Sequence, residues 1–290
     1  MRLVLSVLLA MAALSVSGGV SYGEVMCAVP ADATVEGEAT PAPVEFPVAE
    51  FPEEGGELTI FAAASLTDAY NDMAEQLMAD NPNLNIVIET AGSQTLVTQL
   101  EEGASADVLA TANTSTMDRV QEGGLISGDP VVFTGNRLVI VTPADNPAGI
   151  EGIDDLANDG VRLVLANPEV PVGNYSMLAF CTYSTTDGVP EGFIDSINAN
   201  LVSEEPDVRH VLTKVQLGEA DAGVVYASDA TASMLSGVEL QVFEFPETVP
   251  TRADYPIAVV EGGNTELAIA FISFVLSDEG QEILAHYGFQ

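Results

Sequence analysis

Hydroxyl side chains stand at two places where an apolar run of the sequence meets the start of a predicted helix. Ser65 follows the run 58–63, and Ser93 comes shortly after the run 86–90. A hydroxyl can donate a hydrogen bond, while the first N–H groups of a helix lack partners within it and carry partial positive charge. Such junctions can hold an anion without lysine or arginine. Anion binding is therefore the chemistry that these residues suggest.

Two further junctions of this kind lie in the second half of the chain. Segment 167–175 carries Pro171, which suits a first helical turn, and segment 205–209 opens another apolar helical pattern. Taken singly, each residue has an ordinary explanation: serine and Asp207 are favoured helix caps, and Tyr226 ends an apolar run like any packed strand residue. The order and spacing of the junctions together favour one shared site.

The elements around these junctions predict an α/β fold. Continuous apolar runs predict strands of a parallel sheet covered by helices on both faces. Leu66, Tyr70, Met73 and Leu77 form one face of a helix, and 266–287 is helical with a restart at 277–279. Helix starts in such sheets gather beyond the carboxyl ends of the strands, where ligands bind. The strand candidates are 58–63, 86–90, 108–111, 137–142, 162–166, 223–226 and 256–260.

Composition limits the partners. The 290 residues are 47% hydrophobic, enough for a sizeable core, and carry a formal net charge of −37 with Lys214 as the single lysine. A surface this acidic repels phosphate backbones and anionic membranes, so nucleic acid is not expected as a partner. The lysine-poor, acid-rich composition suggests a saline habitat. An anion must then be attracted by local dipoles, because distant charges are largely screened beyond about 10 Å at 0.1 M salt.

The N-terminus has the pattern of an export signal. Arg2 precedes the apolar run 3–16, and small and polar residues extend to Gly23. The run is too short for a comfortable membrane span, so residues 1–23 are predicted to be a signal peptide. We expect an exported protein, in the periplasm or at the outer face of the cell membrane.

Cys27 opens a Pro- and Glu-rich stretch that we expect to be a flexible tether, residues 24–56. A cysteine in this place resembles the acylated residue of bacterial lipoproteins, but Glu24-Val25-Met26 departs from their usual motif. The alternatives are lipidation of Cys27, cleavage near Gly23 with an ordinary Cys27, and a disulfide with Cys181, the only other cysteine. We consider the disulfide the least expected of the three.

Several segments between 57 and 290 follow one another in a recognisable order: LTIFAAASLTDA (58–69), GASADV (103–108), GNRLV (135–139), NPE (167–169), GEADAGVVYASDA (218–230), YPIAVV (255–260) and YGF (287–289). Together they resemble the periplasmic molybdate-binding proteins, the receptors of molybdate ABC importers. The resemblance implies a two-lobed, periplasmic-binding-protein-like (type II) α/β fold with a hinge of two crossing strands. Lobe I would hold residues 57–135 and 256–290, and lobe II residues 136–255.

The same resemblance implies the site and its ligand. Carried over by motif, the oxyanion donors are the hydroxyls of Ser65, Ser93 and Tyr226 and the backbone N–H groups of Val172 and Val208. The loop before Val172 is one residue shorter than the family pattern. The implied ligand is molybdate or tungstate, the implied partner is an ABC transporter permease, and we expect a monomer without a cofactor. Membrane attachment is expected only through a lipid anchor at Cys27.

The residues themselves leave few other functions open. A fully deprotonated oxyanion only accepts hydrogen bonds, which hydroxyls and N–H groups can donate. Sulfate is the alternative ligand, because it has the same charge and shape as molybdate but shorter bonds. No Gly-x-Ser-x-Gly motif occurs, and His210 and His286 lie far from the serine segments, so we expect no enzyme. No spacing of His, Cys, Asp or Glu suggests a site for a bare metal cation. Arg209 adjoins Val208, but we expect its side chain to point outward.

Overall fold

The computed structural model describes Cys27 and residues 46–290. The predicted signal peptide and most of the predicted tether therefore lie outside the described residues. Among the helices that are described, none has the length and apolar character needed to span a bilayer.

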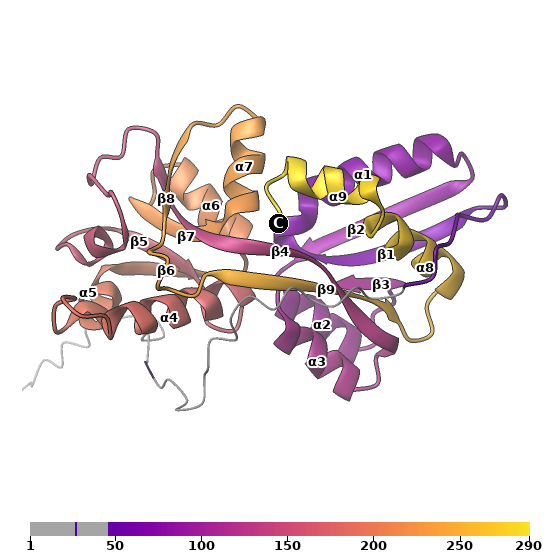
Figure 1. The fold of residues 1–290 in the computed structure, drawn as a ribbon, viewed down its shortest axis with the longest axis horizontal. Helices are drawn as coiled ribbons and strands as arrows, with labels where there is room; N and C mark the ends of the chain where they lie inside the picture. Colours follow the sequence, from indigo (N-terminus) through magenta and orange to yellow (C-terminus); the bar gives the residue numbers. More distant parts are fainter. Residues whose placement is uncertain (1–26, 28–45) are drawn as a thin grey trace, which may run out of the picture.

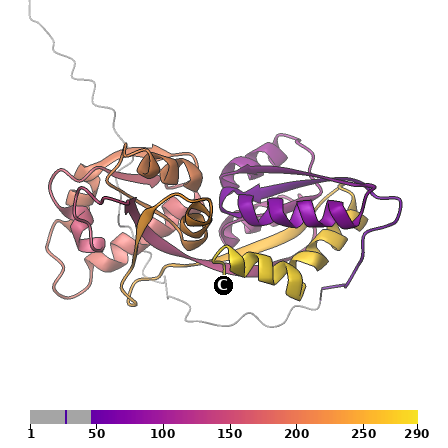
Figure 2. The ribbon, with the colours of Figure 1, turned by 90° about the horizontal axis from the view of Figure 1, so that it is seen from above.

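The described chain folds into two α/β lobes that lie side by side (Figures 1 and 2). We define lobe I by β1 (Gly56–Ala63), η1 (Ala64–Leu66), α1 (Thr67–Asp80), β2 (Leu84–Ala91), α2 (Ser93–Glu101), β3 (Val108–Ala110), α3 (Thr114–Glu122), α8 (Thr265–Val275) and α9 (Asp278–His286). Lobe II holds η2 (Ile153–Ala157), β5 (Leu163–Ala166), α4 (Pro171–Ser184), α5 (Phe193–Asn200), β6 (Leu201–Glu205), α6 (Val208–Gln216), β7 (Ala222–Tyr226), α7 (Ala227–Leu235) and β8 (Leu240–Glu244).

Two long antiparallel strands, β4 (Ile126–Pro143) and β9 (Arg252–Val260), join the lobes. The strand order is β2-β1-β3-β9-β4-β7-β5-β6, with β8 paired to β4. Up to Arg137, β4 pairs with β9, and from Leu138 onward it pairs with β7 and β8 of lobe II. The predicted hinge of two crossing strands is therefore confirmed. The predicted lobe boundaries at 135/136 and 255/256 fall inside these strands and stay a prediction.

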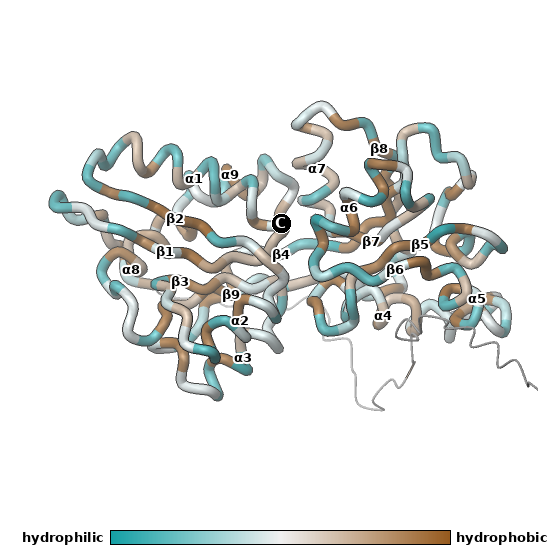
Figure 3. The backbone as a smooth tube through the Cα atoms, turned by 180° about the vertical axis from the view of Figure 1, so that it is seen from behind, coloured by the Kyte–Doolittle hydropathy of each residue, from teal (hydrophilic) through white to brown (hydrophobic). Residues whose placement is uncertain are grey.

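The cores follow the apolar pattern. β3, β5 and β7 are buried throughout and β1 over its second half, because helices cover both faces of the sheet. Figure 3 shows the brown hydrophobic stretches along these strands. Tyr70, Met73 and Leu77 of α1 are buried as predicted, and Ser277 caps the predicted restart at α9. β2 is an edge strand with alternating exposure, contrary to the continuous burial expected for it.

The end of the predicted tether is not a free linker. Phe46 and Phe51 pack against the hydrophobic core, and the N–H of Ala49 donates to Oγ of Ser273 on α8, 3.1 Å away. The expectation of a flexible segment reaching to residue 56 is therefore wrong for residues 46–52. Its two phenylalanines and the hydrogen bond to Ser273 hold this stretch to lobe I.

Cys27 and Cys181 form a disulfide. Cys181 lies on α4 of lobe II and is buried. The sulfur of Cys27 cannot carry both this bond and a thioether to a lipid, so the prediction of a lipid anchor at Cys27 is corrected. The sequence offered this pairing only as the least expected alternative, because spacing does not show that two cysteines 154 positions apart meet in the fold.

We predict that the mature protein contains no free thiol. Peptide mapping without reductant should recover a peptide of Cys27 linked to a peptide of Cys181, and reduction should separate them. Because the bond closes a loop of well over 100 residues, a Cys27→Ser/Cys181→Ser variant should lose about 2–5 kcal/mol of unfolding free energy. Recovery of a lipid-modified Cys27 beside a free Cys181 thiol would contradict the assignment.

Candidate functional site

All five predicted site residues line one cavity between the lobes. Its wall includes Ser65 and Ser93 from lobe I, and Val172, Val208 and Tyr226 from lobe II. Its empty volume is about 210 Å³, a figure that includes space open to solvent. The cavity therefore suits a small, compact ligand that touches both lobes at once.

Three helices begin at this cavity. Ser93 is the first residue of α2, Val172 the second residue of α4, and Val208 the first residue of α6. N–H groups in a first helical turn have no partner within the helix and lie at its positive end. The side chains of Val172 and Val208 are buried in the core. The group of each valine that can bind a ligand is therefore its backbone N–H, as a hydrogen-bond donor.

The two serines are not helix caps, contrary to their ordinary structural explanation. Ser65 lies within η1, and the N-cap of α1 is Leu66, without a side-chain hydrogen bond. Ser93 follows the N-cap Gly92, which likewise has none. Asp207, by contrast, does cap α6, since its Oδ1 accepts from the N–H of His210 at 3.0 Å. The serine hydroxyls are thus left for another purpose.

A buried chain of polar groups sets the direction of the Ser65 hydroxyl. The Asn136 side-chain oxygen accepts from the Arg137 N–H at 2.9 Å, which turns its NH₂ group toward Ser228 and Tyr255. The Tyr255 hydroxyl oxygen accepts from that NH₂ at 3.4 Å and lies 2.8 Å from Oγ of Ser65. Because Tyr255 can then donate its proton to Ser65, the Ser65 proton is free to point into the cavity.

Ser93 and Tyr226 are also arranged as donors. Oγ of Ser93 accepts from the N–H of Ala112 at 3.0 Å, so its own proton remains available. The Tyr226 hydroxyl is buried and has no hydrogen-bond partner among the described residues. Burial raises the pKa of Tyr226 well above its usual range, so the phenol keeps its proton. A buried hydroxyl in need of a partner fits a ligand that accepts.

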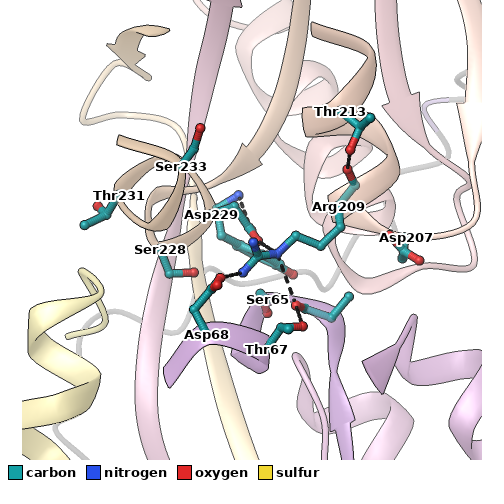
Figure 4. A network of polar contacts seen from close by, with 12 residues as sticks. Ser65, Thr67, Asp68, Asp207, Arg209, Thr213, Ser228, Asp229, Thr231 and Ser233 are labelled. Carbon is teal, nitrogen blue, oxygen red and sulfur yellow. Dashed lines mark hydrogen bonds and ion pairs between the residues drawn. The ribbon is translucent and has the colours of Figure 1, made fainter. Parts of the chain in front are cut away.

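Arg209 departs from its predicted outward direction. Its Nε donates to the carbonyl of Ala64 in lobe I at 3.2 Å, and its guanidinium pairs with Asp68 of lobe I and Asp229 of lobe II (Figure 4). The expectation that it points outward is wrong, because carboxylates on both sides of the cleft attract it. Arg209 is not part of the cavity wall.

Sequence reasoning missed the groups behind the cavity wall. Asn136, Tyr255 and Asp229 all lie in segments that carry the family resemblance, but none belongs to a sequence motif that indicates a function. Their signal is polarity within otherwise apolar, fully buried strands and helix starts. Among the residues the structure describes, no group of three or more His, Cys, Asp or Glu could hold a metal ion.

Comparison with known proteins places the chain among transport receptors. Residues 58–290 match the family of bacterial extracellular solute-binding proteins. The molybdate-binding protein ModA of Mycobacterium tuberculosis is 39% identical over 240 residues, covering 82% of this chain and 86% of that protein. A sulfate-binding protein of Synechococcus elongatus is 28% identical over 217 residues, covering 69% and 61%.

The fold has relatives among solved structures. The periplasmic molybdate-binding protein of Azotobacter vinelandii superposes with a TM-score of 0.69 at 17% identity, covering 80% of this chain and 98% of that one. This likeness supports the two-lobed, periplasmic-binding-protein-like α/β fold.

The site also generates a prediction on pH. Burial, with smaller contributions from Asp68 and Asp207, raises the pKa of Asp229 to about 6, although Arg209 and the Tyr226 N–H oppose the shift. Between about pH 4 and 6 the folded state therefore binds more protons at Asp229 than the unfolded state does. Stability from this group rises as pH falls through 6 and is lost as pH rises again.

Chemical denaturation of wild type and Asp229→Asn from pH 7.5 to 5 tests this. The difference in unfolding free energy, wild type minus variant, should shift in favour of wild type as the pH falls. Repulsion among the many surface carboxylates affects both proteins alike and cancels in the difference. Two parallel stability curves would show that Asp229 does not titrate in this window.

Proposed function

The chain belongs to the family of bacterial extracellular solute-binding proteins, and on that premise we propose that it binds molybdate or tungstate and delivers the oxyanion to an ABC transporter. The single observation that carries the proposal is the convergence of five donor positions, from both lobes, on one small cavity. The 39% identity to a molybdate-binding protein supports the same ligand.

The chemistry of the cavity favours an anion without protons. Ser65, Ser93 and Tyr226 can each donate, as can the N–H groups at the helix starts. Asp207 is the carboxylate of the cavity wall among the described residues, and it is engaged as the cap of α6. Hydrogen phosphate carries a proton that requires an acceptor, whereas molybdate and tungstate at neutral pH do not. The cavity should therefore discriminate against phosphate.

Sulfate is the alternative ligand, because it is also fully deprotonated and tetrahedral. Its shorter bonds would leave longer distances to donors set for molybdate, and a hydrogen bond weakens steeply beyond about 3.2 Å. The sulfate-binding relative is 28% identical, against 39% for the molybdate-binding one. The bond lengths therefore favour molybdate or tungstate over sulfate, and the higher identity supports molybdate.

A receptor is a better account of these residues than an enzyme. A serine nucleophile needs a base within hydrogen-bond reach. Within the described chain, Oγ of Ser65 contacts the Tyr255 hydroxyl and Oγ of Ser93 accepts from a backbone N–H. Neither contact can take up a proton at neutral pH. We infer that the serines bind and do not react, and that no cofactor is required.

Export and partner belong to the same proposal. We propose that the protein works outside the cytoplasm as a monomer and docks on a transporter permease. The Cys27–Cys181 disulfide supports this location, because disulfides persist in oxidising compartments.

We predict selective binding of the larger oxyanions. Molybdate or tungstate at about a thousand times its dissociation constant should raise the unfolding free energy by roughly 4 kcal/mol. Sulfate and phosphate at the same concentration should do far less. Chemical denaturation of the purified chain with each of the four anions measures the stabilisation, and calorimetric titration measures the four affinities. Tighter binding of sulfate than of molybdate would overturn the ligand assignment.

Removing one hydroxyl should weaken binding without unfolding the protein. Each hydrogen bond to a charged group contributes about 1.5–3 kcal/mol, so Ser65→Ala or Ser93→Ala should raise the dissociation constant for molybdate by about one to two powers of ten. Ser105→Ala is the matched control. Ser105 is an exposed serine that precedes β3, at the end of the strand away from the cavity. Titrations at low and high salt should agree closely, because the donors are neutral. Wild-type affinity in both cavity variants would contradict the proposed site.

A further inference from the structure

Arg209 is the point where a charged side chain of lobe II crosses to lobe I. It belongs to the first turn of α6, next to Val208 of the cavity wall. Its partners in lobe I are the carboxylate of Asp68 on α1 and the carbonyl of Ala64, next to Ser65 of the cavity wall. The contact therefore joins the two lobes immediately beside the donors (Figure 4).

The partner in lobe II is of a different kind. Asp229 is completely buried, and its Oδ1 lies 2.9 Å from Nε of Arg209. Its other oxygen accepts from the N–H of Tyr226 at 3.3 Å. Arg209 and Asp229 sit on α6 and α7 of one lobe, so their pairing does not depend on how the lobes are placed. Asp229 therefore holds the guanidinium from within lobe II.

The contacts to lobe I do depend on the placement of the lobes. If the lobes separate about β4 and β9, Asp68 and Ala64 move away from Arg209, while Asp229 stays. A second contact of this type lies nearby, since Nε2 of Gln94 donates to the carbonyl of Pro206 at 3.1 Å. A Cβ atom on Gly92 would stand 2.7 Å from that same carbonyl, so the backbones of the two lobes approach closely here.

We propose that Arg209 and Asp68 form a latch that stabilises the closed cleft and thereby sets ligand affinity, with Asp229 as the group that positions Arg209. This inference rests on the proposed function. The latch does not touch the ligand. It acts through the equilibrium between open and closed lobes, since any contact made only in the closed state shifts that equilibrium toward the state that surrounds the ligand.

Asp68→Asn is the sharpest test, because it breaks only the contact between lobes. Arg209 keeps Asp229, so no buried charge is left without a partner. The two candidate effects also have opposite signs. Removing a carboxylate near an anion site should strengthen anion binding by simple charge repulsion, whereas loss of the latch should weaken it. The pair is partly exposed, 27% for Arg209 and 39% for Asp68, so we expect a roughly three- to tenfold weaker affinity for molybdate.

Asp72→Asn is the matched control. Asp72 lies one turn further along α1, and its carboxylate accepts from the Tyr287 hydroxyl within lobe I. The same charge is removed from the same helix without any change between the lobes. Its molybdate affinity should equal that of wild type or slightly exceed it.

The experiment measures molybdate affinity by calorimetry and the radius of gyration of the ligand-free protein by small-angle scattering, for wild type, Asp68→Asn, Asp72→Asn, Arg209→Gln and Asp68→Asn/Arg209→Gln. The latch predicts weaker affinity and a larger radius for Asp68→Asn than for Asp72→Asn. It also predicts that Asp68→Asn adds little once Arg209 is Gln, because the partner is gone.

The possible results separate the two proposals. Equal affinity and equal radius in Asp68→Asn and Asp72→Asn would overturn the latch while leaving the oxyanion receptor intact. A wild type that binds neither molybdate nor tungstate would overturn the proposed ligand. In that case the scattering comparison alone decides the latch: a larger radius in Asp68→Asn supports it, and an unchanged radius rejects it.

Discussion

The pairing of β4 with β9 across the hinge is the constraint on which the rest of the site depends. The same ladder that joins the lobes places Asn136 and Tyr255 directly behind Ser65, so the hinge also orients a donor of the cavity. Tyr255 is fully buried, with Tyr226 and Phe289 packed edge-on against its ring. A change in the hinge would therefore disturb the direction of a proton as well as the angle between the lobes.

Electrostatics explain why the cavity uses neutral groups. The chain carries a formal charge of −37, and the arginines and the lysine of the described residues form ion pairs with carboxylates. Arg209, the cation nearest to the cavity, faces two carboxylates at once. Helix N-termini and hydroxyls supply positive potential from fixed dipoles. Unlike an arginine or lysine side chain, they cannot be drawn into an ion pair with the abundant carboxylates. A protein of this composition can hold an anion only where such dipoles converge.

The sequence predicts the residues of the cavity wall better than the buried polar residues behind it. Ser65, Ser93, Val172, Val208 and Tyr226 meet in one place because each stands at a strand-to-helix junction, and such junctions gather at one edge of a sheet. The strands β6 and β8 escaped prediction because they are short and partly exposed, without an apolar run. The direction of Arg209 could not be predicted, since it depends on two carboxylates distant in sequence, Asp229 on α7 of the same lobe and Asp68 of lobe I. The pairing of Cys27 with Cys181 likewise depends on contacts that spacing does not encode.

The disulfide also changes the connectivity of the molecule. Cys27 is bonded to α4 in lobe II, whereas the segment beginning at Phe46 packs on lobe I. The backbone from 27 to 46 is therefore a third covalent path between the lobes, beside the two hinge strands. Cuts in β4 and β9 would give three fragments. The N-terminal fragment with Cys27 and the lobe II fragment with Cys181 would still run together on a denaturing gel until a reductant separates them, whereas the C-terminal fragment with α8 and α9 would run alone.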